Sequence, residues 1–106
     1  MSRILELQFE FARMVPRLID KAHELGFEVT LGDAYRDPRA PYGHPKSMHR
    51  SRLAIDLNLF RDGKYLTSSE DHRVLGEWWE SVGGMWGGSE DGNHYSWGAP
   101  YVGMRY

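Results

Sequence analysis

Apolar residues recur at steps of three and four along the first quarter of the chain, which is the spacing of one face of an α-helix. The positions are Ile4, Leu7, Phe11, Met14, Leu18, Ala22 and Leu25. We expect this helix to begin after an N-cap at Ser2 and to end before Gly26. Pro16 lies inside the pattern and should kink the helix or divide it into two segments. Any fold of this chain must therefore accommodate a long amphipathic helix as its first element.

Short strand signals follow the helix. Residues 27–31 alternate as a strand does and carry β-branched side chains at their centre. Residues 53–60 form a second alternating run, in which Asp56 lies on the face of small and polar side chains. The opposite face of this run carries Ile55, Leu57 and Leu59. Asp62-Gly63 is a typical hairpin turn and leads into a third short strand at 64–66.

The remaining pattern completes the order of elements. Residues 33–47 contain three prolines and should form an irregular loop. Residues 68–71 resemble a capping box, and the apolar spacing from 74 to 82 indicates a second helix. A Gly-rich loop follows, with one or two short strands expected around 94–97. This order predicts an α+β fold with a small antiparallel sheet.

Length and composition limit the classes of protein. The chain has 106 residues, so we expect residues 1–106 to form a single domain. Cysteine is absent, so any metal must be held by His and carboxylate ligands. The net charge of −2 gives no general field for nucleic acid or anionic lipid. No stretch resembles a signal peptide or approaches the ~20 apolar residues that span a bilayer, so we expect a product of the bacterial cytoplasm.

Two short segments combine residue types that hold metal ions. In the first, His49 ends a loop and Asp56 lies on the polar face of the next strand; in the second, Asp91 comes three residues before His94. A catalytic zinc takes three nitrogen and oxygen ligands and keeps one position for water. His49, Asp56 and His94 would supply that set, with Asp91 as general base. Each residue alone also has an ordinary interpretation, as a surface carboxylate, a loop hydrogen-bonder or part of a polar turn.

At these positions the chain resembles the zinc peptidase family of D-Ala-D-Ala carboxypeptidases, vancomycin-resistance dipeptidases and L-alanyl-D-glutamate phage endolysins. The family's first signature is Ser-x-His-x-x-Gly-x-Ala-x-Asp, and the matching residues here are Ser47, His49, Ala54 and Asp56. The second signature is an acid, two residues, a His and usually an aromatic, matched by Asp91, His94 and Tyr95. The third is a Tyr-Arg pair at the end of the first strand, matched by Tyr35 and Arg36.

The resemblance implies a Hedgehog/DD-peptidase-like single domain that holds Zn²⁺ on the three predicted ligands. It implies that Asp91 is the catalytic base and that Arg36 binds substrate and the developing oxyanion. The substrate-binding residues that it suggests are Ser47, Tyr35 and Tyr95. Arg52 stands where the signature has Gly, so we expect the turn there to be reached with an ordinary φ or to differ slightly.

The likeness is strongest to phage and prophage members, around residues 52–60 and 78–80. The short loops leave room for an open groove rather than a closed chamber. We therefore expect an endolysin-type L-alanyl-D-glutamate endopeptidase, a monomer that cuts peptidoglycan and lyses the host cell wall after its release from the cytoplasm. The alternatives are a D-alanyl-D-alanine carboxypeptidase and a non-catalytic, metal-stabilised module that binds the cell wall or a phage tail.

Several other residues carry weaker expectations. Glu90 is the second candidate for the general base. His72 has no motif support and should face solvent. At most one of Trp78 and Trp79 should face the core. The two remaining tryptophans could wall the substrate groove or pack in the core, and these are Trp86 and Trp97.

Overall fold

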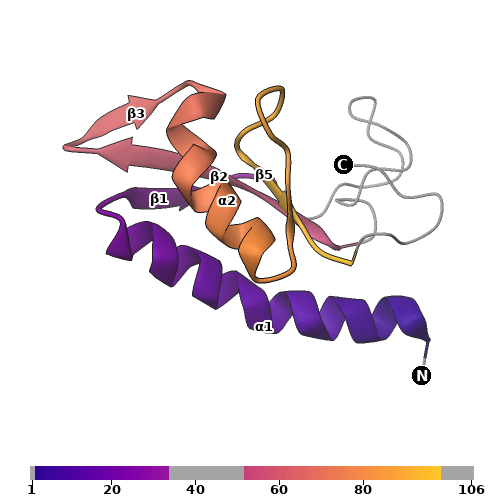
Figure 1. Cartoon of the computed structure of the whole chain (residues 1–106). Helices are drawn as coiled ribbons and strands as arrows, with labels where there is room; N and C mark the ends of the chain where they lie inside the picture. The colour runs from indigo at the N-terminus through magenta and orange to yellow at the C-terminus, as the bar shows by residue number, and fades with distance from the viewer. Residues whose placement is uncertain (1, 34–51, 99–106) are drawn as a thin grey trace.

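The computed structural model describes residues 2–33 and 52–98, and Figure 1 shows the arrangement of the elements. Their order is α1 (Arg3–Glu24), β1 (Glu28–Leu31), β2 (Ala54–Arg61), β3 (Lys64–Leu66), the 3₁₀ helix η2 (Ser69–His72), α2 (Arg73–Ser81), β4 (Met85–Trp86) and β5 (His94–Ser96). Within these described residues, two α-helices pack against one five-stranded antiparallel sheet. The predicted α+β class is confirmed.

Helix α1 follows the predicted pattern. Ser2 is its N-cap, and the Ser2 hydroxyl accepts a hydrogen bond from the Leu5 N–H at 3.2 Å. The buried face consists of Leu7, Phe11, Met14, Leu18 and Ala22. Of the two effects expected at Pro16, a kink or a division, the division does not occur, because the helix continues through this residue. Pro16 and Ala12, whose carbonyl loses its helical partner, are both exposed, so water can satisfy that carbonyl while the opposite face stays packed. In the described part of the chain, no helix is both long and apolar enough to cross a membrane.

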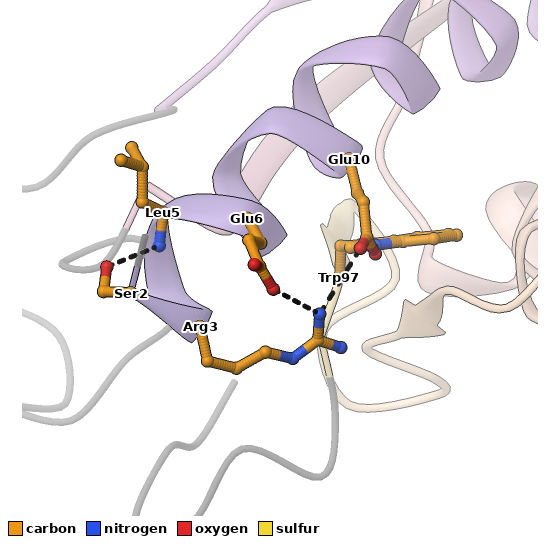
Figure 2. Close-up of polar contacts among 6 residues, drawn as sticks. All are labelled: Ser2, Arg3, Leu5, Glu6, Glu10 and Trp97. Atoms are coloured by element: carbon orange, nitrogen blue, oxygen red, sulfur yellow. Dashed lines mark hydrogen bonds and ion pairs between the residues drawn. The ribbon is translucent and has the colours of Figure 1, made fainter.

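The start of α1 is joined to the end of β5 through Trp97. The indole Nε1 of Trp97 donates a hydrogen bond to Glu10 Oε1 at 3.1 Å, between residues 87 positions apart in the sequence. Arg3 lies between Glu6 and Glu10, at 3.5 and 3.4 Å from their carboxylate oxygens, as Figure 2 shows. These ion pairs are exposed and each should contribute little. Trp97 thus packs against the core and α1.

Strand β2 is the centre of the sheet. Strand β1 pairs with residues 57–60 along one edge of β2. Strands β3 and β5 pair with the two ends of its other edge, and β4 pairs with β5. The β2–β3 hairpin turns at Asp62 (φ 54°) and Gly63 (φ 78°), and two positive φ values are typical of the predicted tight turn. The two-residue β4 is too short for the sequence pattern to predict, and it fell in the expected loop.

The helices and the sheet meet at Trp79 of α2, which is fully buried. Its ring packs edge-on against Phe11 of α1 and Tyr95 of β5, with centroids 6.4 and 6.5 Å apart. The Trp79 indole N–H donates to the Ser96 carbonyl at 2.9 Å, so its polar edge is satisfied. Trp86 is also buried, which favours the core interpretation of that residue over a groove wall.

Candidate metal and catalytic site

Asp56 and His94 are direct cross-strand partners in the β2–β5 pair. The flanking backbone bonds run from Leu57 N to the Asn93 carbonyl and from Trp97 N to the Leu53 carbonyl. Asp56 and His94 therefore form a non-hydrogen-bonded pair, the kind in which opposite side chains lie closer together. Because side chains alternate along a strand, both lie on the face opposite the buried Ile55. The structure thus brings together two of the three predicted zinc ligands.

The separation of these side chains fits a zinc site. His94 Nδ1 lies 3.5 Å from Asp56 Oδ1 and 3.9 Å from Asp91 Oδ2. Two ligands that each stand ~2.1 Å from a tetrahedral zinc are ~3.4 Å apart, so the Asp56–His94 distance matches one edge of such a tetrahedron. The side chains of His94, Asp56 and Asp91 are 2%, 21% and 57% exposed. The His94 side chain is buried and the Asp56 side chain is partly buried, whereas the Asp91 carboxylate is exposed to solvent.

A bulge directly after β1 fixes the backbone of Asp56. The Asp56 N–H donates to the Asp33 carbonyl at 2.7 Å, and the Asp56 carbonyl accepts from the Gly32 N–H at 2.8 Å. Two successive residues beyond β1 thus oppose one residue of β2, an arrangement that often directs a side chain next to an active site. A Cβ on Gly32 would lie 3.1 Å from Asp56 Cβ, so glycine allows this close approach.

A turn explains the spacing of Asp91 and His94. The His94 N–H donates to the Asp91 carbonyl at 3.0 Å, which closes a four-residue turn. The His94 carbonyl in turn accepts from the Gly87 N–H at 2.9 Å. Because the turn reverses the chain between Asp91 and His94, the Asp91 carboxylate lies beside the His94 imidazole. This geometry explains why the acid precedes the histidine by three residues. This contact supports Asp91 over its neighbour Glu90 as the candidate base.

The other predicted site residues lie outside the described part of the chain. These are the third ligand His49, the substrate-binding candidates Tyr35 and Ser47, and the catalytic candidate Arg36. Within residues 2–33 and 52–98, no three His, Cys, Asp or Glu side chains form a group that could hold a metal ion. The described residues supply two of the three predicted ligands and the candidate base.

Tyr95 and His72 occupy positions that the sequence analysis did not predict. Tyr95 was expected to bind substrate, but it is fully buried and pairs with Ile55 on the core side of the sheet. His72 was expected to face solvent, but it is only 3% exposed. Its Nδ1 shares a hydrogen bond with the Tyr95 hydroxyl at 2.7 Å. Both expectations are corrected. Tyr95 faces the core because it alternates with His94 along β5, and the 3₁₀ helix η2 packs His72 against Tyr95.

Burial keeps both members of this pair neutral. It lowers the pKa of His72 from 6.5 to about 4, and this effect outweighs the opposing effect of the Asp71 charge. It also raises the pKa of the Tyr95 hydroxyl. A neutral imidazole and a protonated phenol can share one hydrogen bond without leaving a buried charge.

The low pKa of His72 predicts a loss of stability in acid. The unfolded chain takes up a proton at His72 below its ordinary pKa of 6.5, whereas the folded protein resists this until about 4. The contribution is complete above pH 6.5 and lost as the pH falls towards 4. We expect the free energy of unfolding to fall by about 2–3 kcal/mol from this residue between pH 7.5 and 4.5. Urea unfolding with a chelator present measures it, and the difference between wild type and His72→Gln isolates the effect. Parallel pH curves for the two proteins would contradict it.

Arg52 differs from the expectation of an ordinary backbone. Its φ is +57°, in the left-handed region that favours glycine. Arg52 occupies the position at which the family signature has Gly, directly before the strand that carries Asp56. The turn into β2 therefore has the conformation that the signature glycine would adopt without strain.

Arg52→Gly should be more stable than Arg52→Ala, because both lose the contacts of the Arg52 side chain but only glycine adopts the left-handed φ without strain. Relief of this strain outweighs the extra backbone entropy of glycine and leaves a difference of about 0.5–1 kcal/mol. The melting temperature of the Gly variant should be higher than that of the Ala variant by roughly 2–6 °C. Arg52→Ala is the control, because it removes the same side-chain contacts but keeps the strained φ. Equal melting temperatures for the Gly and Ala variants would show that this strain has no measurable cost.

A comparison with protein-family models finds none that matches this chain. Among curated proteins, none is significantly similar to it.

Proposed function

We propose that this chain is a zinc-dependent peptidase that hydrolyses the stem peptides of peptidoglycan. The observation that carries the proposal is the Asp56–His94 pair, whose nitrogen and oxygen lie 3.5 Å apart, with the Asp91 carboxylate 3.9 Å from the same nitrogen. A catalytic zinc takes three protein ligands and keeps one position for water, and this arrangement would supply two of the ligands together with a carboxylate that can act as the base. The resemblance to the zinc peptidase family supplies His49 as the third ligand.

The residues divide the chemistry between them. When bound, zinc supplies a Lewis acid that lowers the pKa of water and polarises the peptide carbonyl. His94 and Asp56 would hold the metal from paired strands, which are more rigid supports than loops. Asp91, on the solvent side, accepts the proton of the attacking water and returns it to the departing amine. Arg36, by its resemblance to the family's arginine, binds a substrate carboxylate or the developing oxyanion.

The exposure of Asp91 favours an endopeptidase. A carboxypeptidase must enclose a free carboxylate and exclude longer chains, whereas an endopeptidase must admit a cross-linked polymer. The Asp91 carboxylate is 57% exposed, which is compatible with an open groove at the catalytic base. Together with the likeness to phage enzymes, this supports cleavage between L-Ala and D-Glu by a monomeric lysis enzyme that reaches the wall after release from the cytoplasm.

Digestion of purified peptidoglycan tests the proposal. The protein with zinc should release fragments with new D-Glu amino termini, identified by mass spectrometry. A chelator should stop the reaction, and zinc should restore it. Release of free D-Ala alone would instead indicate a D,D-carboxypeptidase. Binding to the wall without any product, unaffected by zinc, would indicate a non-catalytic module.

A further inference from the structure

The 3₁₀ helix η2 contacts the chain on both sides of His94. On one side, the Ser69 hydroxyl accepts a hydrogen bond from the Gly92 N–H at 2.9 Å. On the other, His72 Nδ1 and the Tyr95 hydroxyl share a hydrogen bond at 2.7 Å. Gly92 lies between Asp91 and His94, and Tyr95 directly follows His94. A single turn of four residues thus holds the segment that carries the candidate base and one candidate ligand.

The Gly92 backbone is held at both of its polar groups. Its N–H bonds to Ser69, and its carbonyl accepts from the Trp86 indole N–H at 2.7 Å. A Cβ on Gly92 would overlap the Cα of Ser69, so the turn packs directly against this backbone. A Cβ on Gly76 of α2 would likewise overlap the Trp86 ring, so Trp86 packs closely between α2 and the segment. These contacts leave the peptide next to Asp91 little freedom to rotate.

The η2 turn is itself well anchored. The Ser68 hydroxyl accepts from the Glu70 N–H at 3.1 Å, and Asp71 Oδ2 accepts from the Ser68 N–H at 3.1 Å. This is the capping box predicted from the sequence. The turn continues directly into α2, whose Trp79 lies in the core. Because the capping box fixes the start of η2 and α2 fixes its end, the position of η2 can determine the positions of Gly92 and Tyr95.

We infer that η2 is the positioning element of the active site, and that Ser69 and the His72–Tyr95 pair set the directions of the Asp91 carboxylate and the His94 imidazole. This inference rests on the proposed zinc peptidase function and extends it to residues outside the ligand set. Ser69 is a positioning residue, since its described contact is with the Gly92 backbone. Residues that contact the ligands of a metal, but not the metal itself, orient those ligands, and the loss of such a contact typically costs about 10–100-fold in metal affinity or activity.

Two substitutions with matched controls test the inference. Ser69→Ala removes the acceptor for the Gly92 N–H, and Tyr95→Phe removes the partner of His72. The controls are Ser81→Ala, which removes a hydroxyl bonded to the Trp78 carbonyl at 2.6 Å, and Tyr65→Phe at an exposed ring. In the zinc enzyme, Ser69→Ala and Tyr95→Phe should each lower kcat by about 10–100-fold while KM changes little. With Co²⁺ in place of zinc, both should also shift the visible absorption bands, and the controls should not.

Nuclear magnetic resonance of the metal-free protein gives a measurement that needs neither zinc nor substrate. Ser69→Ala should speed hydrogen exchange at the Gly92 amide and shift the ring signals of His94, whereas Ser81→Ala should leave both unchanged. Unchanged Gly92 exchange and His94 signals in Ser69→Ala would overturn the inference. A wild-type protein that neither binds zinc nor cuts peptidoglycan would overturn the proposed function, while the resonance shifts would still report whether η2 positions this segment.

Discussion

Replacing Asp91 by Asn should leave zinc bound and lower kcat by about 10²–10⁴-fold, which is the usual contribution of a positioned general base. The amide has nearly the shape of the carboxylate but cannot accept the proton of the attacking water. Asp91 is 57% exposed, so the substitution should change the free energy of unfolding little. The rate of stem-peptide cleavage and the zinc content of the same preparation measure the two halves of this expectation.

Glu90→Gln is the matched control for Asp91→Asn, because it neutralises the neighbouring acid in the same turn. It should keep near wild-type turnover. The assignment of the base is wrong if Glu90→Gln loses activity and Asp91→Asn keeps it. Loss of zinc from Asp91→Asn would show instead that Asp91 is a metal ligand.

Zinc should stabilise the wild-type protein strongly and an Asp56→Asn variant hardly at all. A ligand that binds only the folded state at 100 times its Kd adds about 2.7 kcal/mol to the free energy of unfolding. For a domain of this size, that corresponds to a rise in melting temperature of about 10 °C or more. Asp56→Asn keeps the size of the side chain and the backbone bonds to Gly32 and Asp33, but it removes the charged oxygen ligand. The variant should also lose detectable hydrolysis.

Asn58→Ala is the control for this substitution. Asn58 lies two residues further along the same face of β2, where its amide donates to the Thr30 hydroxyl at 3.2 Å. This variant should retain the full zinc-dependent rise in melting temperature. An equal rise in Asp56→Asn would place the zinc elsewhere on the protein. Melting curves recorded with a chelator and with excess zinc make the comparison.

Much of this fold could be predicted from the sequence, because strand alternation, tight turns and helix caps depend mainly on residues that are close together in the chain. The alternation in β2 put Asp56 opposite the apolar face, and the hairpin at Asp62-Gly63 and the capping box at Ser68 form as expected. Pro16 does not divide α1, because the effect of a proline on a helix depends on which side faces solvent, and tertiary packing decides that. Arg52 was misjudged because the turn imposes a strained φ that an arginine does not signal.

The candidate site was predictable only in part, for a related reason. The spacing of Asp91 and His94 reflects a local turn, which a sequence signature can record. The contact between η2 and the 92–95 segment joins residues 23 positions apart, and it depends on how α2 packs against the sheet. The capping box at Ser68 predicted where η2 begins, but no sequence pattern predicted the buried contact between His72 and Tyr95.

A crystal structure of the zinc-loaded protein, with anomalous scattering recorded at the zinc absorption edge, tests the central claim most directly. We predict one strong peak per chain, at ~2.0–2.2 Å from His94 Nδ1 and from an Asp56 carboxylate oxygen, with His49 as the third protein ligand. A peak bound by other residues, or zinc-loaded crystals in which His94 and Asp56 contact no metal, would contradict the account.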